Sequence, residues 1–273
     1  MAESKINLLK GRFLLWALLI PLTLIVMALP VWVATIYALI WIIAASTEFI
    51  ILYLKSFKVH YVLFLFSPLI IWLYTLNVTE LPFSLHLAVA FLVQIILWLI
   101  ISPGKPEQIL PLLVLPLYLG FMPAHLVLLK QDSTAQSHGY MWLVFPFIII
   151  WLNDTFAYLA GSLIGRTPLC PKISPKKTVE GFVAGVLLSA IVGSVFWILF
   201  QKDKPWWWGV LLALAVAMAG VLGDLLESAI KRERKVKNTS EILGGHGGFL
   251  DRIDSLIFGV LVYYYLYPFL TKL

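Results

Sequence analysis

Residues 31–54 read VWVATIYALIWIIAASTEFIILYL, a continuous apolar stretch in which Glu48 is the single charged side chain. An α-helix needs roughly 20 consecutive apolar residues to cross the hydrocarbon core of a bilayer. A strand of a membrane barrel would instead be about ten residues long and would alternate in polarity. The stretch is continuous and about twice that length, so it predicts a membrane-spanning helix.

The whole chain has the same character. Of its 273 residues 61% are hydrophobic and only 12% are charged, whereas a soluble globular protein has about 25% charged residues. We therefore predict an all-α polytopic membrane protein with about nine transmembrane helices. The apolar segments lie near 13–29, 31–54, 59–77, 82–102, 108–129, 140–164, 181–200, 206–230 and 251–270.

The basic residues predict how the helices are oriented. If the nine segments alternate in direction, 16 of the 20 Lys and Arg residues fall on the side of the N-terminus. Because cytoplasmic loops of membrane proteins collect Lys and Arg, we expect a cytoplasmic N-terminus and a C-terminus on the outer side. The formal net charge of +6 then reflects orientation. We expect no nucleic-acid binding, since no basic run is interleaved with aromatic residues.

The polar residues are distributed unevenly along the chain. Residues 1–139 hold about five helices with short loops, and we assign them to an N-terminal transmembrane region. Residues 140–273 hold about four helices with cytoplasmic loops at 165–180 and 231–250, and we expect function there. Cys170 is the only cysteine, so neither an intrachain disulfide nor a thiolate metal cluster is expected.

Carboxylates within predicted spans are costly, and therefore they indicate function. Asp224 and Glu227 lie three residues apart near the end of the eighth segment, and Asp251 and Asp254 repeat that spacing in the ninth. Between these pairs lie the basic run KRERKVK at 231–237 and the sequence GGHGG at 244–248. Mg²⁺ prefers carboxylate oxygens and completes its coordination with water and substrate phosphate. Lys and Arg neutralise phosphate, and glycines let backbone N–H groups approach it. The combination predicts a metal-assisted phosphate site.

A second basic cluster, ISPKKTVEG at 173–181, follows the sixth segment. Pro175 disfavours helix at the preceding residue, so we predict an ordered loop that presents Lys176 and Lys177. Both clusters fall on the predicted cytoplasmic side, where they would grip one polyphosphate ligand together.

Each feature alone has a structural explanation. The basic run would serve as a topology determinant, the glycine run as a flexible turn, and the acids of the ninth segment as N-terminal helix carboxylates. Glu227 would pair with Lys231 at i+4. The role of Glu48 stays open between a buried hydrogen-bonded acid and a member of a polar cavity.

The motif that runs from Ser228 to Asp254 resembles the phosphatidate cytidylyltransferase, or CDP-diacylglycerol synthase, family. It reads SAIKRERKVKNTSEILGGHGGFLDRID. The stretch 174–181 and the pair Asn153-Asp154 are similar to that family as well. Asn238 stands where the family usually has Asp, and Gly244 where Pro is common.

The resemblance implies transfer of CMP from CTP to phosphatidic acid, with Mg²⁺ as cofactor at one or two sites. We expect catalysis to involve Asp224, Asp251, Asp254, Lys231, Arg232 and His246, of which Asp224, Asp251 and Asp254 would bind metal. We expect substrate binding by Arg166, Lys176, Lys177, Lys237, Gly247, Gly248 and Arg252.

Two other functions remain as alternatives. A CTP-dependent polyprenol or phytol kinase would have similar metal and phosphate requirements but would release CDP. An ion-coupled transporter would use the intramembrane acids as an ion pathway, although the internal repeats common in transporters are not visible. The expected location is the inner cell membrane, with the site facing the cytoplasm and the bilayer as a partner. A homodimer is one option for the oligomeric state.

Overall fold

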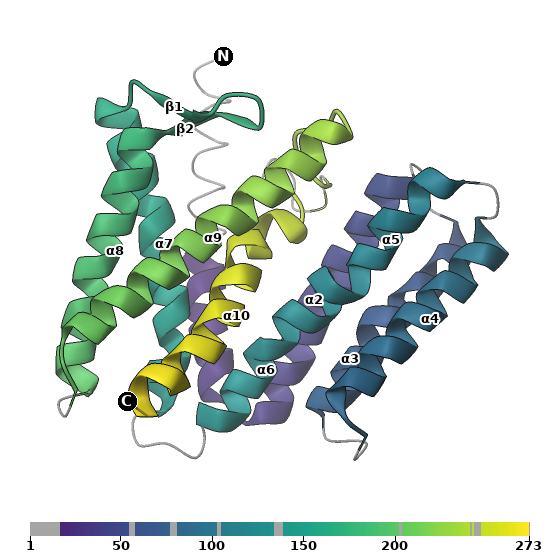
Figure 1. Cartoon of the computed structure of the whole chain (residues 1–273), viewed down its shortest axis with the longest axis horizontal. Coiled ribbons are helices and arrows are strands. Elements are labelled where there is room, and N and C mark those ends of the chain that lie inside the picture. The colour runs from purple at the N-terminus through teal and green to yellow at the C-terminus, as the bar shows by residue number, and fades with distance from the viewer. Residues whose placement is uncertain are drawn as a thin grey trace.

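A computed structural model describes residues 17–54, 58–76, 81–102, 105–133, 139–201, 204–240, 242 and 247–272. Helices dominate it, and one two-stranded hairpin lies at one end of the bundle (Figure 1). The N-terminal half comprises a helix at Ala17–Ala28 followed by α2 (Val31–Leu54), η1 (Val59–Leu65), α3 (Phe66–Thr75), α4 (Phe83–Ile101), η2 (Pro106–Gln108), α5 (Ile109–Leu115), η3 (Pro116–Phe121) and α6 (Met122–Ser133). The C-terminal half comprises α7 (Gly139–Ile164), β1 (Pro168–Cys170), β2 (Ser174–Thr178), α8 (Val179–Phe200), α9 (Trp207–Glu233) and α10 (Leu250–Lys272).

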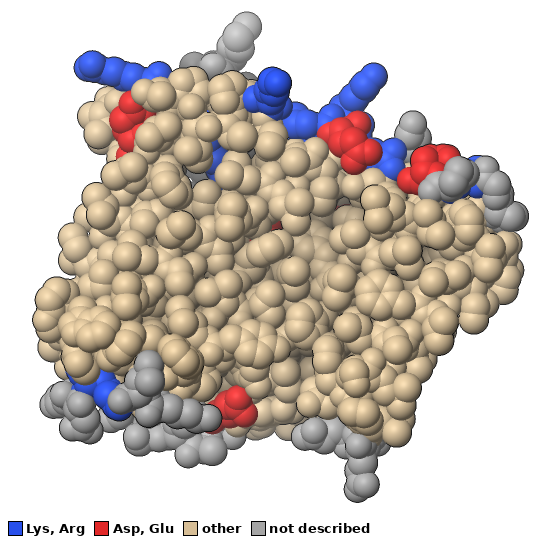
Figure 2. All heavy atoms as spheres, viewed as in Figure 1, with Lys and Arg blue, Asp and Glu red and all other residues tan. Residues whose placement is uncertain are grey.

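The prediction of an all-α polytopic membrane protein is confirmed. Within the described residues, seven helical stretches are long and apolar enough to cross a membrane. The predicted segments 13–29 and 59–77 coincide with two shorter apolar helices, Ala17–Ala28 and Val59–Thr75, so the count of nine spans stays a prediction. Figure 2 shows a broad uncharged band across the molecule, with Lys and Arg gathered along the end that bears the hairpin.

Prolines divide two of the predicted apolar segments. Segment 59–77 consists of the 3₁₀ helix η1 and the α-helix α3, and Pro68 lies in the first turn of α3. Segment 108–129 contains the π-helical turn η3, which begins at Pro116. Proline lacks the N–H that would continue the α-helical hydrogen bonds, and each of these two changes of helical type lies within two residues of a proline.

Two hydrophobic cores hold the bundle together. One is built largely from α7, α8, α9 and α10, with Trp142, Phe145 and Trp197 among its buried side chains. The other is built largely from α2 to α6 and also includes Ile253 and Ile257 of α10. Helix α10 contributes to both cores and therefore connects the two halves. The division into regions 1–139 and 140–273 stays a prediction.

Small residues let the C-terminal helices approach closely. A Cβ atom at Gly193 of α8 would lie 2.3 Å from the Cβ of Ala213 in α9. A Cβ at Gly223 of α9 would lie 2.4 Å from the carbonyl oxygen of Asp254 in α10. Transmembrane helices associate through such small-residue contacts, because lipid offers them no hydrophobic drive to associate. The second contact lies among the predicted catalytic residues.

Candidate active site

The ordered loop predicted after α7 is an antiparallel hairpin. Strands β1 and β2 pair with Pro168 opposite Thr178 and Cys170 opposite Ser174. The hydroxyl of Thr178 accepts a hydrogen bond from Gly181 N and thereby caps α8. The Glu180 carboxylate accepts hydrogen bonds from the backbone N–H groups of Arg166 and Thr167. Local capping therefore fixes the base of the hairpin against α8.

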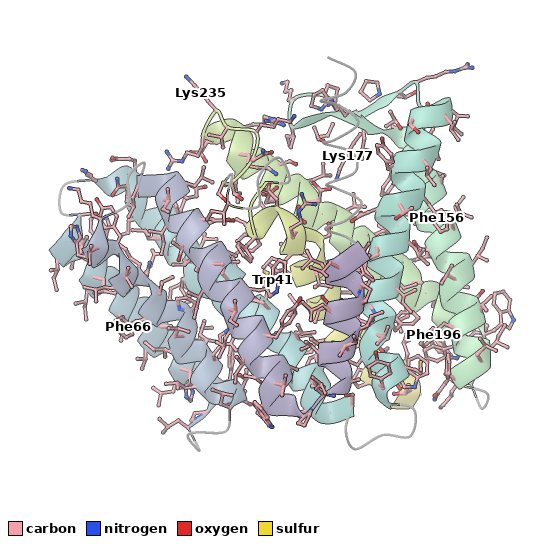
Figure 3. All side chains as sticks on the ribbon, turned by 180° about the vertical axis from the view of Figure 1, so that it is seen from behind. Trp41, Phe66, Phe156, Lys177, Phe196 and Lys235 are labelled. Carbon is pink, nitrogen blue, oxygen red and sulfur yellow. The ribbon has the colours of Figure 1, made fainter. Side chains whose placement is uncertain are left out.

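The hairpin brings the two basic clusters together, as the sequence predicts. Lys177 on β2 forms an ion pair with Asp224 on α9. Arg232, at the end of α9, donates through Nε to the carbonyl oxygen of Ile173, at 3.1 Å. Figure 3 shows Lys177 and Lys235 at the same end of the molecule. Residues about 50 positions apart in the chain thus form one surface.

The predicted acids line a polar cavity of about 210 Å³ between α7, α9 and α10. We call this the acidic cavity. Its charged lining residues are Asp154 from α7, Asp224 and Lys231 from α9, and three residues from α10. The residues from α10 that carry charge are Asp251, Arg252 and Asp254. Asp224 of the first predicted acid pair therefore meets both acids of the second pair, Asp251 and Asp254, across the contact between α9 and α10.

Lys231 joins the two acid-bearing helices. Its ammonium group pairs with Glu227 one turn earlier in α9, which confirms the predicted i+4 pair. The same Nζ lies 2.6 Å from Asp251 Oδ1 on α10. Glu227 is fully buried and Lys231 nearly so. Because loss of one partner from a buried ion pair leaves an uncompensated charge, these three side chains depend on one another.

A wider cavity of about 520 Å³ opens beside the acidic cavity. We call it the basic groove, because Lys176 and Lys177 line it together with Tyr158 of α7. It shares Asp154 and Asp224 with the acidic cavity. A ligand in the basic groove therefore reaches the same carboxylates that face α10.

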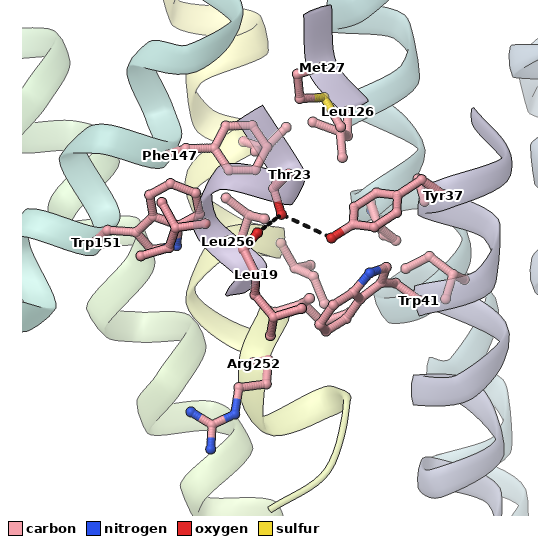
Figure 4. A pocket seen from close by; sticks show the side chains of 17 residues that line it. Leu19, Thr23, Met27, Tyr37, Trp41, Leu126, Phe147, Trp151, Arg252 and Leu256 are labelled. Carbon is pink, nitrogen blue, oxygen red and sulfur yellow. Dashed lines mark hydrogen bonds between the residues drawn. The ribbon is translucent and has the colours of Figure 1, made fainter. Parts of the chain in front are cut away.

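An apolar pocket adjoins the acidic cavity on another side (Figure 4). Aliphatic and aromatic side chains from Ala17–Ala28, α2, α6, α7 and α10 form its wall. Its polar side chains include Thr23 and Tyr37, whose hydroxyls lie 2.9 Å apart. Trp151, Arg252 and Leu256 line both this pocket and the acidic cavity. Arg252 lies at one end of the pocket, so its guanidinium group is next to the apolar side chains that line the rest of it.

The remaining predicted residues lie elsewhere. Among the described residues that line the three cavities, Arg166, Arg232 and Lys237 do not occur. The N–H of Gly248 donates to Asp251 Oδ2 at 2.7 Å, so it is directed at a protein carboxylate. Gly247 has a positive φ of 82° and lies against Asp251, where a Cβ would be 2.7 Å from Oδ2. His246 and Gly244 lie outside the described residues.

The donor set suits a hard divalent cation. Asp154, Asp224, Asp251 and Asp254 all bring carboxylate oxygens to the acidic cavity, and Mg²⁺ binds through a few such oxygens with water and phosphate. In the described part of the chain, no three acid, His or Cys side chains are already gathered as a metal site. The ammonium groups of Lys177 and Lys231 lie beside Asp224 and Asp251. The three predicted metal ligands therefore stay a prediction.

Two carboxylates at the site were not among the predicted site residues. Asp154 lines both the acidic cavity and the basic groove. Its position within a predicted membrane span could have identified it as a functional residue. Glu48 of α2 contacts the segment that precedes α10. Its position within the apolar stretch 31–54 marked it as unusual, but the partner segment lies about 190 residues later in the chain.

Comparison with known proteins gives the site a family. A phosphatidate cytidylyltransferase of Staphylococcus saprophyticus is 46% identical over 123 residues, which are 45% of this chain and 47% of the relative. Those of Bacillus subtilis and Aquifex aeolicus are 39% identical over 131 residues and 45% identical over 155 residues. These alignments cover 48% and 49%, and 54% and 54%, of this chain and of the respective relative. The chain thus spans about half the length of the curated relatives it matches. The sequence profile of the cytidylyltransferase family matches residues 10–270, and the chain therefore belongs to the cytidylyltransferase family.

Proposed function

We propose that the protein transfers CMP from CTP to phosphatidic acid, which yields CDP-diacylglycerol and pyrophosphate. The observation that carries this proposal is the junction of the three cavities. A basic groove and an apolar pocket both adjoin one acidic cavity, and each shares lining residues with it. A water-soluble triphosphate and a lipid phosphate would therefore meet beside the same carboxylates. The names of the relatives support the same reaction.

Each cavity suits one part of the two substrates. CTP would occupy the basic groove, where Lys176 and Lys177 would neutralise phosphate charge. The lipid would place acyl carbons in the apolar pocket, whose aliphatic and aromatic lining offers surroundings like those of the bilayer core. Arg252, at the junction, would hold the lipid phosphate through a two-pronged hydrogen bond.

The reaction needs little covalent chemistry from the protein. An oxygen of the lipid phosphate attacks the α-phosphorus of CTP, a new P–O bond forms, and the bond to the β-phosphate oxygen breaks with release of pyrophosphate. The nucleophile is already an anion, so no side chain has to remove a proton. Rate enhancement would come from positioning and from neutralisation of charge by Lys177, Lys231 and Arg252.

We also propose that Mg²⁺ binds in the acidic cavity. Asp224, Asp251 and Asp254 would hold it, and Asp154 lines the same cavity. When bound, the ion would neutralise phosphate charge and orient the triphosphate. The ammonium groups of Lys177 and Lys231 would then turn from these carboxylates to substrate phosphate.

The basic end of the molecule would face the cytoplasm of a bacterial inner membrane. Lys and Arg gather at the end that bears the hairpin (Figure 2), and loops rich in these residues remain cytoplasmic. This orientation opens the basic groove to the compartment that contains CTP. The apolar pocket would at the same time lie within the bilayer, from which the lipid arrives.

Turnover by the purified protein in detergent tests the proposal. Labelled CTP and phosphatidic acid would be supplied with Mg²⁺ or with EDTA, and we expect CDP-diacylglycerol and pyrophosphate with Mg²⁺ only. Asp224→Asn should abolish product, whereas Asp132→Asn, a carboxylate of α6 near Tyr264, should retain it. Release of CDP with a phosphorylated alcohol would instead indicate a lipid kinase. Folded protein that forms no product from CTP would refute the proposal.

A further inference from the structure

Glu48 of α2 is a buried carboxylate with four hydrogen-bond donors around it. Its side chain is 1% exposed. Oε1 accepts from Ser240 Oγ at 2.6 Å and from Phe249 N at 2.9 Å. Oε2 accepts from Thr239 Oγ1 at 3.0 Å and from Leu250 N at 2.9 Å. Within the described residues no Lys, Arg or His forms an ion pair with it, so these donors and the adjacent helix terminus compensate its charge.

The donors come from both ends of the connection between α9 and α10. Thr239 and Ser240 follow α9, whereas Phe249 directly precedes α10 and Leu250 is its first residue. The first N–H groups of a helix have no acceptor within the helix, and its N-terminus bears a partial positive charge. Glu48, on a different helix, accepts from the N–H of Leu250 and from that of Phe249 just before it. It therefore caps the 23-residue helix α10 from the N-terminal half of the chain.

One residue, Thr239, connects Glu48 to Asp251 of the acidic cavity. The hydroxyl of Thr239 lies 3.0 Å from Glu48 Oε2 and 2.8 Å from Asp251 Oδ2. Asp251 Oδ2 also accepts from Thr239 N and Gly248 N, at 3.0 and 2.7 Å. At Gly248 a Cβ atom would lie 2.3 Å from Glu48 Oε2, so only glycine allows this approach. The single hydroxyl proton of Thr239 is shared between the carboxylates of Glu48 and Asp251.

We propose that Glu48 is a positioning residue for cytidylyl transfer. It fixes the first turn of α10, and thereby Asp251 and Arg252, relative to the acids of α9. The inference rests on the proposed function for its catalytic consequence. Packing between α2 and α10 has other sources, because Ile42 of α2 and Ile253 of α10 belong to the same hydrophobic core. Loss of the cap should therefore disturb the site more than it disturbs the fold.

Glu48→Gln removes the charge at nearly constant shape. The amide –NH₂ must face Phe249 N or Leu250 N, and two donors then oppose each other. A hydrogen bond to a charged group contributes enough to change an opening equilibrium by about 10- to 100-fold. We expect kcat to fall by about 10- to 100-fold, with the KM for CTP within about twofold of wild type. Thr47→Val is the matched control, because the Thr47 hydroxyl donates only to Ile43 O within α2.

Hydrogen–deuterium exchange gives a readout that does not depend on activity. In Glu48→Gln the amides of residues 249 and 250 should exchange at least tenfold faster than in Thr47→Val. Ser240→Ala removes a single donor to Glu48 and serves as the milder variant, with an expected kcat loss of about two- to fivefold if Glu48→Gln does not fold.

If the amides of residues 249 and 250 exchanged no faster in Glu48→Gln than in Thr47→Val, the conclusion that Glu48 caps α10 would be wrong. Faster exchange with unchanged kcat per folded molecule would overturn the positioning role, and so would a fully active Ser240→Ala. Wild-type protein that forms no CDP-diacylglycerol would refute the proposed function and the positioning role with it. The exchange result would still decide whether Glu48 caps α10.

Discussion

Gly223→Ala tests whether the spacing between α9 and α10 sets the geometry of the acidic cavity. A Cβ atom at position 223 would lie 2.4 Å from the carbonyl oxygen of Asp254 and 2.9 Å from Cδ2 of Phe258. Ordinary contact begins near 3.4 Å, so α10 would have to retreat by about 1 Å, because packed interiors leave no free space. Asp254 would move away from Asp224, the neighbour of the substituted residue.

The magnitude follows from that displacement. A misplacement of about 1 Å at reacting groups costs up to about 100-fold in rate, and we expect kcat to fall by about 10- to 100-fold. Gly220→Ala is the matched control on the same helix. Its Cβ would meet Ile150 Cγ1 at 3.5 Å and Ser255 Cβ at 3.6 Å, which is ordinary contact. Alanine is also the better helix former, by about 1 kcal/mol.

The assay is CDP-diacylglycerol formation per folded molecule in one detergent, with unfolding followed by tryptophan fluorescence. We expect Gly220→Ala to unfold no earlier than wild type and to keep its rate. If Gly223→Ala retained more than half the rate of Gly220→Ala, the spacing argument would be wrong.

Three further substitutions test the other parts of the site. Lys177→Met removes the ammonium group beside Asp224, and the KM for CTP should rise about tenfold while the KM for phosphatidic acid stays constant. Leu126→Trp fills the apolar pocket, and initial rates in mixed micelles should show a higher KM for long-chain phosphatidic acid and no change for CTP. Gly193→Ala drives a Cβ to within 2.7 Å of Gly209 O; it should lower the unfolding temperature through a cost of about 1–3 kcal/mol and leave both KM values unchanged.

The helices and the acid-bearing positions were predictable, because both follow from local composition. Apolar stretches of sufficient length become helices in a bilayer whatever their neighbours. Asp224 and Asp251 were recognisable, since carboxylates in apolar stretches have few structural uses. The i+4 pair of Glu227 with Lys231 follows from helical geometry alone and is confirmed.

The hairpin and the role of Glu48 were not predictable, because distant contacts determine them. The strand SPKKT has weak β propensity, and it is held by β1 and by the bond from Arg232 to Ile173 O. Glu48 finds its donors 191 to 202 residues later in the chain. Sequence patterns within one segment do not indicate which remote backbone groups a buried carboxylate will meet.

The place of α10 in both hydrophobic cores has a consequence for biosynthesis. A polypeptide enters the membrane from its N-terminal side, so every other described helix is made before α10. Until α10 inserts, Glu48 lacks the N–H group of Leu250, and Lys231 lacks its second carboxylate partner, Asp251. Insertion of this single helix closes both cores and completes the acidic cavity in one step. A nascent chain therefore cannot bind its substrates productively before its last described span is in place.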